Sequence, residues 1–114
     1  MSEECIFCKI AKGDIPADKI LETETLLAFK DVNPVAPTHV LIIPREHIST
    51  LNHVKSEKSG IAGEMLMAAK EVAQKTGVAE TGYRTIINTN RQAGQEIFHL
   101  HMHVIGGRPL EKMG

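Results

Sequence analysis

The sequence has few of the residues that characterise several common protein classes. Its 114 residues include no tryptophan, one tyrosine, three phenylalanines and only two cysteines. Two cysteines are too few for the disulfide framework of a small secreted domain. The formal net charge is −1, and the 13 basic side chains are scattered among 14 acidic ones, so the basic stripe of a nucleic-acid binder is not expected. These absences favour a small-molecule partner.

Long apolar segments are also missing. No run approaches the roughly 20 apolar residues that span a membrane, so no membrane partner is expected. Residues Met1 to Glu4 lack the charged start and apolar core of a signal peptide, and we therefore expect a cytoplasmic protein. The length indicates a single domain over residues 1–114, because no repeat or linker divides the chain.

Apolar periodicity and turn residues predict an α+β fold with a five-stranded antiparallel sheet and two helices. The short helix is expected over residues 5–12, where Gly13 can end it. The long helix is expected from Ser56, as its cap, to about Thr76. Its apolar arc is wider than one sheet face requires, which predicts a second contact surface. The expected strands are 19–22, 26–30, 39–44, 83–88 and 97–105.

The most informative feature is a run of three histidines at alternate positions, His99, His101 and His103. Alternate side chains of a β-strand point to the same face, so an extended segment 97–105 would align three imidazoles. The apolar residues between them would face the core. Core packing gives no reason to place three histidines in this register, so the pattern indicates chemistry.

Two kinds of chemistry fit three aligned imidazoles. The outer histidines would lie about 13 Å apart at the rise of a strand. Zinc–nitrogen distances of about 2.0–2.1 Å would then require a sharply bent strand, so a metal shared by all three is not expected. Adjacent imidazoles can instead place a nucleophile beside a group that binds or protonates an anion.

The two cysteines form a separate motif. Cys5 and Cys8 have the CxxC spacing of half a zinc site. A redox role is less favoured, because the motif does not begin a helix after a strand in a βαβ unit. Two further ligands are needed for a closed tetrahedral site. Two buried free thiols are the alternative.

The histidine run resembles the signature of the histidine triad (HIT) superfamily, and Gly106-Gly107-Arg108 resembles that of its Hint branch, the histidine triad nucleotide-binding proteins. The resemblance implies a homodimer of five-stranded protomers that hydrolyses nucleoside 5′-phosphoramidates or related nucleotidyl compounds, with no cofactor needed for the chemistry. It extends over nearly the whole chain, in order through Ile6-Phe7, Lys9-Ile10, Ile15 to Ala17, Ala28 to Val32, Ala36 to His39, Ile43-Pro44, His47-Ile48, Gly82 to Arg84, Asn88 and Gly94-Gln95.

The resemblance also implies a catalytic role for three histidines. His101 corresponds to the family nucleophile, which attacks the α-phosphorus, expels the amine and forms a nucleotidyl-histidine that water cleaves. His103 would contact the non-bridging phosphate oxygens, where a donor stabilises developing charge. His39 would orient the nucleophile through a hydrogen bond.

The nucleotide site implied by the resemblance begins at Asp31, whose carboxylate would accept from the ribose hydroxyls, and Val32, which would pack on a purine. Gly94 would let backbone amides approach the phosphate. Glu96 stands where some relatives carry a serine that protonates the leaving amine, and as a carboxylate it would repel the phosphate. Both roles of Glu96 stay open. The remaining positions are Phe7, Ile10 and Phe29 for the base, with Asn88 and Gln95 near the phosphate.

In relatives with a CxxC motif, two histidines complete a structural zinc site, and the resemblance places them at His47 and His99. His99 would then face away from the chemistry. Three other functions stay open: a non-catalytic purine nucleotide-binding adaptor, a dinucleoside polyphosphate hydrolase, and a hydrolase with zinc at the triad itself. The Gly106-Gly107-Arg108 motif argues against the second of these.

Overall fold

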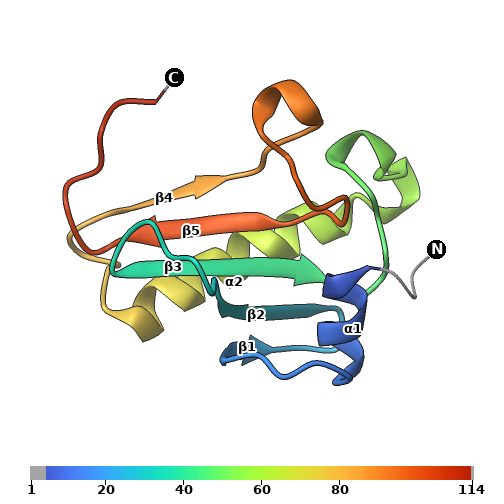
Figure 1. Ribbon diagram of the computed structural model, residues 1–114, viewed down its shortest axis with the longest axis horizontal. Helices are drawn as coiled ribbons and strands as arrows, with labels where there is room; N and C mark the ends of the chain where they lie inside the picture. Colours follow the sequence, from blue (N-terminus) through green and yellow to red (C-terminus); the bar gives the residue numbers. More distant parts are fainter. Residues whose placement is uncertain (1–4, 114) are drawn as a thin grey trace.

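The structure, a computed structural model, describes residues 5–113 and contains one antiparallel sheet with two α-helices (Figure 1). The strands follow the spatial order β1-β2-β3-β5-β4. This arrangement confirms the predicted α+β class. The expectation that no signal peptide occupies Met1 to Glu4 concerns residues outside the described ones. The elements are α1 (Ile6–Lys12), β1 (Lys19–Glu22), β2 (Leu26–Lys30), β3 (Thr38–Pro44), α2 (Gly60–Thr76), β4 (Tyr83–Ile86) and β5 (Met102–Gly106), with short 3₁₀ turns at Leu51–His53, Ser56–Lys58 and Arg91–Ala93.

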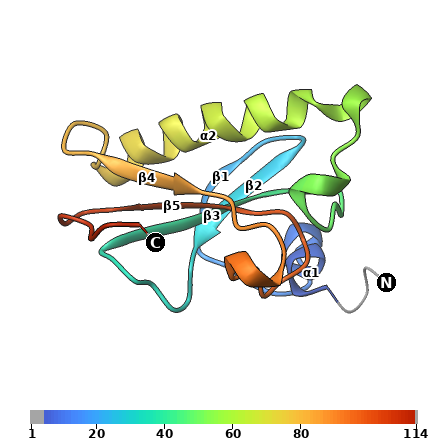
Figure 2. The same ribbon diagram turned by 90° about the horizontal axis from the view of Figure 1, so that it is seen from above.

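The sheet separates two layers. Figure 2 shows α2 along one face, while α1 and the 91–93 turn lie on the other. Because alternate strand residues point to opposite faces, the inner strands supply side chains to both layers. The smaller cluster, beside α1, contains Phe7, Ile10, Leu27, Phe29, Leu41 and Ile43. The larger cluster, under α2, contains Leu26, Ala28, Val40, Ile42, Ile48, Met65, Ala68, Ala69, Val72, Leu100, Met102 and Val104.

The helix ends follow the sequence signals at their C-termini and differ at one N-terminus. Gly13 and Gly77 adopt φ angles of 86° and 81°, the left-handed conformation that ends a helix and favours glycine. Ser56 does not cap the long helix, because Ser56–Lys58 form a 3₁₀ turn and α2 begins at Gly60. The amide of Ser59 donates to the carbonyl of Ser56 at 3.1 Å, a tighter turn than an α-helix allows.

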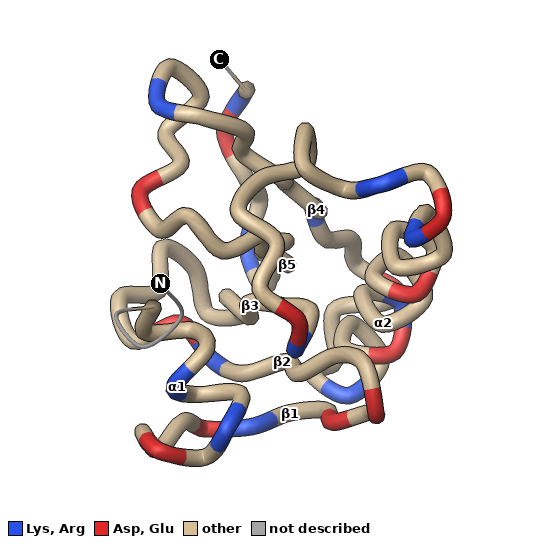
Figure 3. Tube along the Cα trace, turned by 90° about the vertical axis from the view of Figure 1, so that its right-hand side faces the viewer, with Lys and Arg blue, Asp and Glu red and all other residues tan. Residues whose placement is uncertain are grey.

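The outer side of α2 retains exposed apolar side chains. Leu66 is 56% exposed and Met67 is 62% exposed, whereas Met65 and Val72 of the same helix are buried. Within residues 5–113, no helix has the length and apolar character needed to cross a membrane. Figure 3 shows basic and acidic residues interspersed along the chain.

The histidine segment corrects the prediction of a single strand over 97–105. Residues 97–99 form a bend, and β5 begins only at Met102. The bend is held by contacts distant in sequence: the amide of Leu100 donates to the carbonyl of Ile48 at 2.6 Å. Of the three histidines, only His103 therefore lies in the strand. The strand predicted over 83–88 likewise ends at Ile86, which pairs with His103 at the start of the β4–β5 ladder.

Candidate functional site

A cleft of about 710 Å³ opens on the sheet face opposite α2. Its size lies within the range of small-molecule sites. Most of the residues predicted for catalysis or for the nucleotide site line it. These are Phe7, Ile10, Phe29, Asp31, Val32, His39, Asn88, Gly94, Glu96, His101 and His103.

One end of the cleft is apolar. The Phe7 ring, carried by α1, meets Phe29 of β2 edge-on at a centroid distance of 5.6 Å. Phe7 also meets the ring of His101 edge-on at 5.2 Å. Ile10 is buried beside them, whereas Val32 is 90% exposed. The buried rings can receive a flat apolar group, and Val32 lies at the margin of that surface.

His101 has a defined proton position. Its Nδ1 lies 2.8 Å from the carbonyl oxygen of His99. A carbonyl can only accept, so Nδ1 of His101 carries the proton and donates. The other nitrogen of a neutral imidazole is then an unprotonated acceptor. Nε2 of His101 therefore has a free lone pair, as a nucleophile requires.

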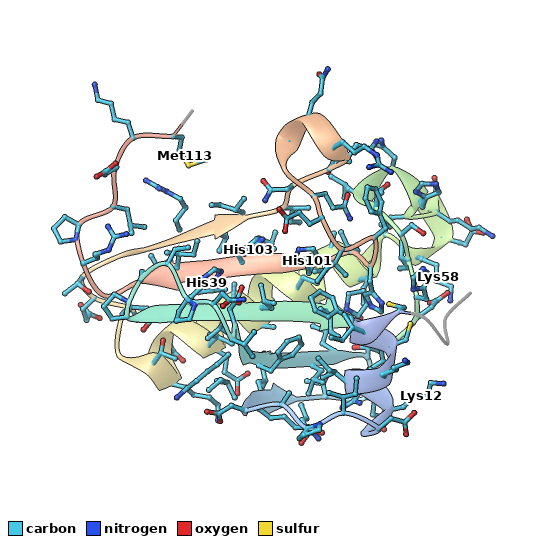
Figure 4. The ribbon with its side chains drawn as sticks, viewed as in Figure 1. Lys12, His39, Lys58, His101, His103 and Met113 are labelled. Atoms are coloured by element: carbon cyan, nitrogen blue, oxygen red, sulfur yellow. The ribbon has the colours of Figure 1, made fainter. Side chains whose placement is uncertain are left out.

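A chain of hydrogen bonds fixes the protons of two further histidines, which lie close to His101 over β3 and β5 (Figure 4). The amide of Val35 donates to His39 Nδ1 at 3.1 Å, so neutral His39 carries its proton on Nε2. That Nε2 donates to His103 Nδ1 at 2.9 Å. His103 is left with its proton on Nε2. His39 thus bonds to His103, whereas the resemblance to the family implies a hydrogen bond to His101.

The surroundings of His39 and His103 favour the neutral form of both rings. Burial lowers the pKa of His103 to about 4, and the neighbouring His101 and His39 add to this effect against the opposing charge of Asp31. Burial also lowers the pKa of His39, again opposed by Asp31. At neutral pH, His103 is therefore a neutral imidazole that donates through Nε2–H.

Asp31 combines a turn with a place in the cleft. Its Oδ1 accepts from the amide of Asn33 at 2.8 Å, which is an Asx turn. Its Oδ2 lies 3.4 Å from His39 Nε2. Asp31, His39 and His103 also lie close enough to be considered as metal ligands, but the bond from Val35 keeps the His39 proton on Nε2. A hydrogen-bond chain therefore describes these three residues better than a metal site.

Gln95 differs from the other predicted site residues because its side chain points into the protein. Its Oε1 accepts from the amide of Asn90 at 2.8 Å, and its Nε2 donates to the carbonyls of Ser49 at 2.9 Å and Ile97 at 3.1 Å. Gln95 therefore shapes the loop before the histidines. Gly94 in that loop has a φ angle of 93°, which is strained for residues with a side chain.

A second cluster lies outside the cleft and contains Cys5, Cys8, His47 and His99, whose candidate ligand atoms are all within 4.8 Å of one another. His99 Nδ1 is 3.3 Å from Cys5 Sγ and 3.5 Å from Cys8 Sγ, and His47 Nδ1 is 3.3 Å from Cys8 Sγ. The structure thus brings together the four residues that the resemblance assigned to zinc.

The donor set and geometry of this cluster fit zinc. Zinc–sulfur bonds of about 2.3 Å and zinc–nitrogen bonds of about 2.0–2.1 Å at tetrahedral angles separate sulfur from nitrogen by about 3.5 Å. The observed separations are 3.3 to 3.5 Å. His99 Nε2 donates to the carbonyl of Pro44 at 2.7 Å, which leaves Nδ1 free for a metal and orients the ring as outer partners of metal ligands do.

Without a cation, the surroundings of Cys8 favour its neutral thiol. Burial raises the pKa of Cys8 to about 11, and the hydrogen bond and charge of Cys5 add to the increase. A bound zinc ion would reverse this balance, because thiolates are its preferred ligands.

Three contributors to the two sites have no signal in the sequence. They are the amide of Val35 and the carbonyls of Pro44 and His99. Backbone groups are present at every residue, so only the fold identifies them. His53 belongs to neither site: it is exposed, and its Nδ1 lies 2.8 Å from Thr50 Oγ1.

Known proteins match this chain over nearly its full length. The model of the HIT domain family matches residues 12–110. The purine nucleoside phosphoramidase of Escherichia coli strain K12 is 49% identical over 113 residues, which cover 99% of this chain and 95% of that protein. Protein HitA of Neisseria gonorrhoeae is 43% identical over 104 residues, which cover 91% of this chain and 96% of that protein.

Solved structures show the same fold. The HIT family hydrolase from Legionella pneumophila Philadelphia 1 has a TM-score of 0.91 at 48% identity, covering 94% of this chain and 96% of that one. A histidine triad protein from Clostridium difficile has a TM-score of 0.94 at 39% identity, covering 97% of this chain and 96% of that one. With three histidines around one cleft and its sequence matched from residue 12 to residue 110, the chain belongs to the HIT domain family.

Proposed function

We propose that this protein hydrolyses the P–N bond of nucleoside 5′-phosphoramidates or related nucleotidyl compounds through a covalent intermediate on His101. One observation carries the proposal: His101 offers an unprotonated Nε2, while His103, lining the same cleft, carries a proton on its Nε2. A nucleophile and a neutral donor are thus held side by side. The name of the E. coli relative supports the reaction class.

In the first step, Nε2 of His101 attacks the α-phosphorus. The P–N bond of the substrate breaks, and the leaving amine takes the bonding electron pair and a proton from solvent. The nucleotidyl-imidazole keeps its Nδ1 proton, and the hydrogen bond to the His99 carbonyl stabilises the positive charge that develops on the ring. The donor geometry seen in the free protein therefore suits the intermediate as well.

In the second step, water attacks the phosphorus and the bond to His101 breaks. The nucleotide leaves as the monophosphate, and Nε2 regains its lone pair. During both steps His103 Nε2–H can donate to a non-bridging phosphate oxygen. Such a donor stabilises charge that develops in the transition state.

We place the base of the nucleotide at the apolar end of the cleft and its phosphate at the end that contains His101 and His103. The apolar surface of Phe7, Ile10 and Phe29 would receive the base, and a purine offers the larger flat surface to pack there. Asp31 Oδ2 would accept from the ribose hydroxyls. The phosphate would then lie at His101 and His103, near the loop that contains Gly94.

The direct test is mass spectrometry of protein quenched rapidly during turnover of an adenosine 5′-phosphoramidate. We expect a nucleotidyl adduct on the peptide that contains His101. His101→Ala should abolish turnover and retain AMP binding, and His53→Ala is the matched control because His53 lies outside the cleft. Retained turnover in His101→Ala would refute the mechanism. A wild-type protein that binds AMP without hydrolysis would be the adaptor instead.

We also propose that Cys5, Cys8, His47 and His99 hold a structural zinc ion. When bound, the ion supplies a cross-link between α1, the segment after β3 and the bend before β5. The support is the agreement of the sulfur–nitrogen distances with a tetrahedral site. Metal analysis of the purified protein should give one zinc per chain, and loss of the metal in Cys8→Ser would identify the site.

The homodimer is proposed on two surface features. Leu66 and Met67 on α2 are exposed apolar residues, and β4 is an edge strand of the sheet, which leaves backbone groups free to pair. Sedimentation of the wild type should give the mass of two chains. Met67→Glu should shift the equilibrium towards the monomer, whereas Asp14→Asn, at an exposed residue just after α1, should leave it unchanged.

A further inference from the structure

His99 takes part in both functional regions. Its ring lies in the cysteine cluster, with Nδ1 3.3 Å from Cys5 Sγ and 3.5 Å from Cys8 Sγ. Its backbone carbonyl accepts the Nδ1 proton of His101 at 2.8 Å. One residue thus connects the cluster to the ring proposed as the nucleophile.

We propose that the cluster of Cys5, Cys8, His47 and His99 positions the nucleophile, so that loading of the cluster sets the rate of the chemical step. The inference rests on the proposed function, in which His101 attacks phosphorus. The cluster residues do not line the cleft, so a metal held there would not touch the substrate. They act through the placement of the His99 carbonyl.

The segment that carries this carbonyl is not held by the sheet. Residues 97–99 are a bend, and β5 begins at Met102. Three hydrogen bonds anchor the bend: Leu100 N to Ile48 O at 2.6 Å, the His99 ring to Pro44 O at 2.7 Å, and Gln95 Nε2 to Ile97 O at 3.1 Å. The contacts of the His99 ring are therefore a main constraint on where its own carbonyl points.

A second contact runs through helix α1. Cys5 caps this helix, its sulfur accepting from the Cys8 amide at 3.3 Å. Phe7, between the two cysteines, packs edge-on against the ring of His99 at 5.9 Å and that of His101 at 5.2 Å. The cluster thus fixes one wall against which the His101 ring rests. The His99 carbonyl and the Phe7 ring therefore both contact the imidazole of His101.

The chemical consequence concerns the proton of His101. The two neutral forms of an imidazole differ only in which nitrogen carries the proton, and the hydrogen-bond partner selects between them. If the His99 carbonyl moves, part of the population places the proton on Nε2. That form has no lone pair for phosphorus, so the rate falls while nucleotide binding persists.

The main test is His47→Gln in the protein as purified with its metal. His47 is exposed, contacts Cys8 Sγ at 3.3 Å and does not line the cleft, so the change removes a ligand that does not touch the substrate. We expect kcat to fall about tenfold, the typical effect of disturbing the surroundings of a metal site, with KM and the Kd of AMP within about twofold. His53→Gln is the matched control and should match the wild type.

An activity-independent measurement follows the ring itself. Nitrogen-15 NMR of labelled histidine should show His101 protonated on Nδ1 in the wild type and a mixture of the two forms in His47→Gln. His47→Cys, which keeps four zinc ligands, should restore both kcat and the Nδ1 proton. If His47→Gln does not fold, the same spectra are recorded on wild-type protein stripped with a chelator and then reloaded with zinc chloride.

Two results would overturn the proposal. One is an unchanged kcat in a folded His47→Gln protein that has lost its metal. The other is an unchanged Nδ1 proton on His101 after metal removal. If the wild type fails to hydrolyse the phosphoramidate, the proposed function falls, whereas the NMR measurement still tests the coupling.

Discussion

His39 Nε2 donates to His103 Nδ1 across 2.9 Å, and the amide of Val35 on the other nitrogen of His39 gives this hydrogen bond its direction. A backbone turn therefore determines which nitrogen of His103 carries the proton. The donor that faces the phosphate in the proposed mechanism depends on a contact with a residue four positions before His39.

Substitution of His39 tests this chain of protons. His39→Leu removes the donor to His103 Nδ1, and a buried acceptor left without its partner costs enough to lower kcat about tenfold. His39→Gln offers an amide N–H near the same place and should retain most of the wild-type kcat. Steady-state kinetics on both variants provide the measurement. Equal losses in the two variants would show that the proton of His39 has no role.

The pH dependence of stability follows from the lowered pKa values. In the unfolded chain histidine titrates near 6.5, whereas burial lowers the pKa of His103 to about 4 and also lowers that of His39. Between these values the unfolded state binds more protons. The contribution of these two buried, neutral histidines to the free energy of unfolding is therefore fully present above pH 6.5 and is lost as the pH falls towards 4.

Urea unfolding at several pH values measures this effect. His103→Gln removes one of the two groups, so its unfolding free energy should depend less steeply on pH than that of the wild type, by at most about 1.4 kcal/mol per pH unit. His53→Gln provides the control for loss of an exposed histidine. Parallel curves for the wild type and His103→Gln between pH 4 and 6.5 would contradict the assignment.

Gln95 is predicted to be a residue for stability. Gln95→Ala removes its bonds with Asn90, Ser49 and Ile97. Loss of these three partly buried hydrogen bonds should lower the free energy of unfolding by about 2–3 kcal/mol. The exposed Gln92 in the same loop is the matched control, and Gln92→Ala should change it by less than about 0.5 kcal/mol. Denaturant titration compares the two.

Glu96 tests the balance of charge at the cleft. Its side chain is exposed and lines the cleft that contains His101. An ionised carboxylate there opposes an incoming phosphate, so Glu96→Gln should tighten AMP binding about twofold at low salt, with the difference screened at high salt. Calorimetric titration measures this effect. A large fall in kcat, with binding unchanged, would instead assign Glu96 to protonation of the leaving amine.

The sequence predicts the regular parts of the fold because their causes are local. Alternating apolar residues place Met102 and Val104 under α2, and Gly13 and Gly77 end their helices where expected. The bend at 97–99 has no such cause, since it depends on carbonyls of Pro44 and Ile48 about fifty residues away. The sequence therefore predicts one strand face for the three alternating histidines, and this prediction is wrong for His99 and His101.

The candidate site also has parts that the sequence reveals and parts that only the fold reveals. His101 and His103 are visible as alternating residues, and the resemblance to the family supplies Asp31 and His39. The direction of each hydrogen bond between the rings depends on backbone groups, such as the amide of Val35, that no residue type reveals. The cytoplasmic location and the nucleotide partner stay predictions.

The strand order gives the site an uneven resistance to local opening. His39 and His103 lie on β3 and β5, each of which has a neighbouring strand on both sides, and amides in such inner ladders exchange with solvent mainly through global unfolding. Asp31 and Gly94 lie in connecting segments, where smaller fluctuations expose the backbone. Hydrogen exchange should therefore find the amides of His39 and His103 in the slowest-opening part of the molecule and those of the groups that admit the substrate in a faster one.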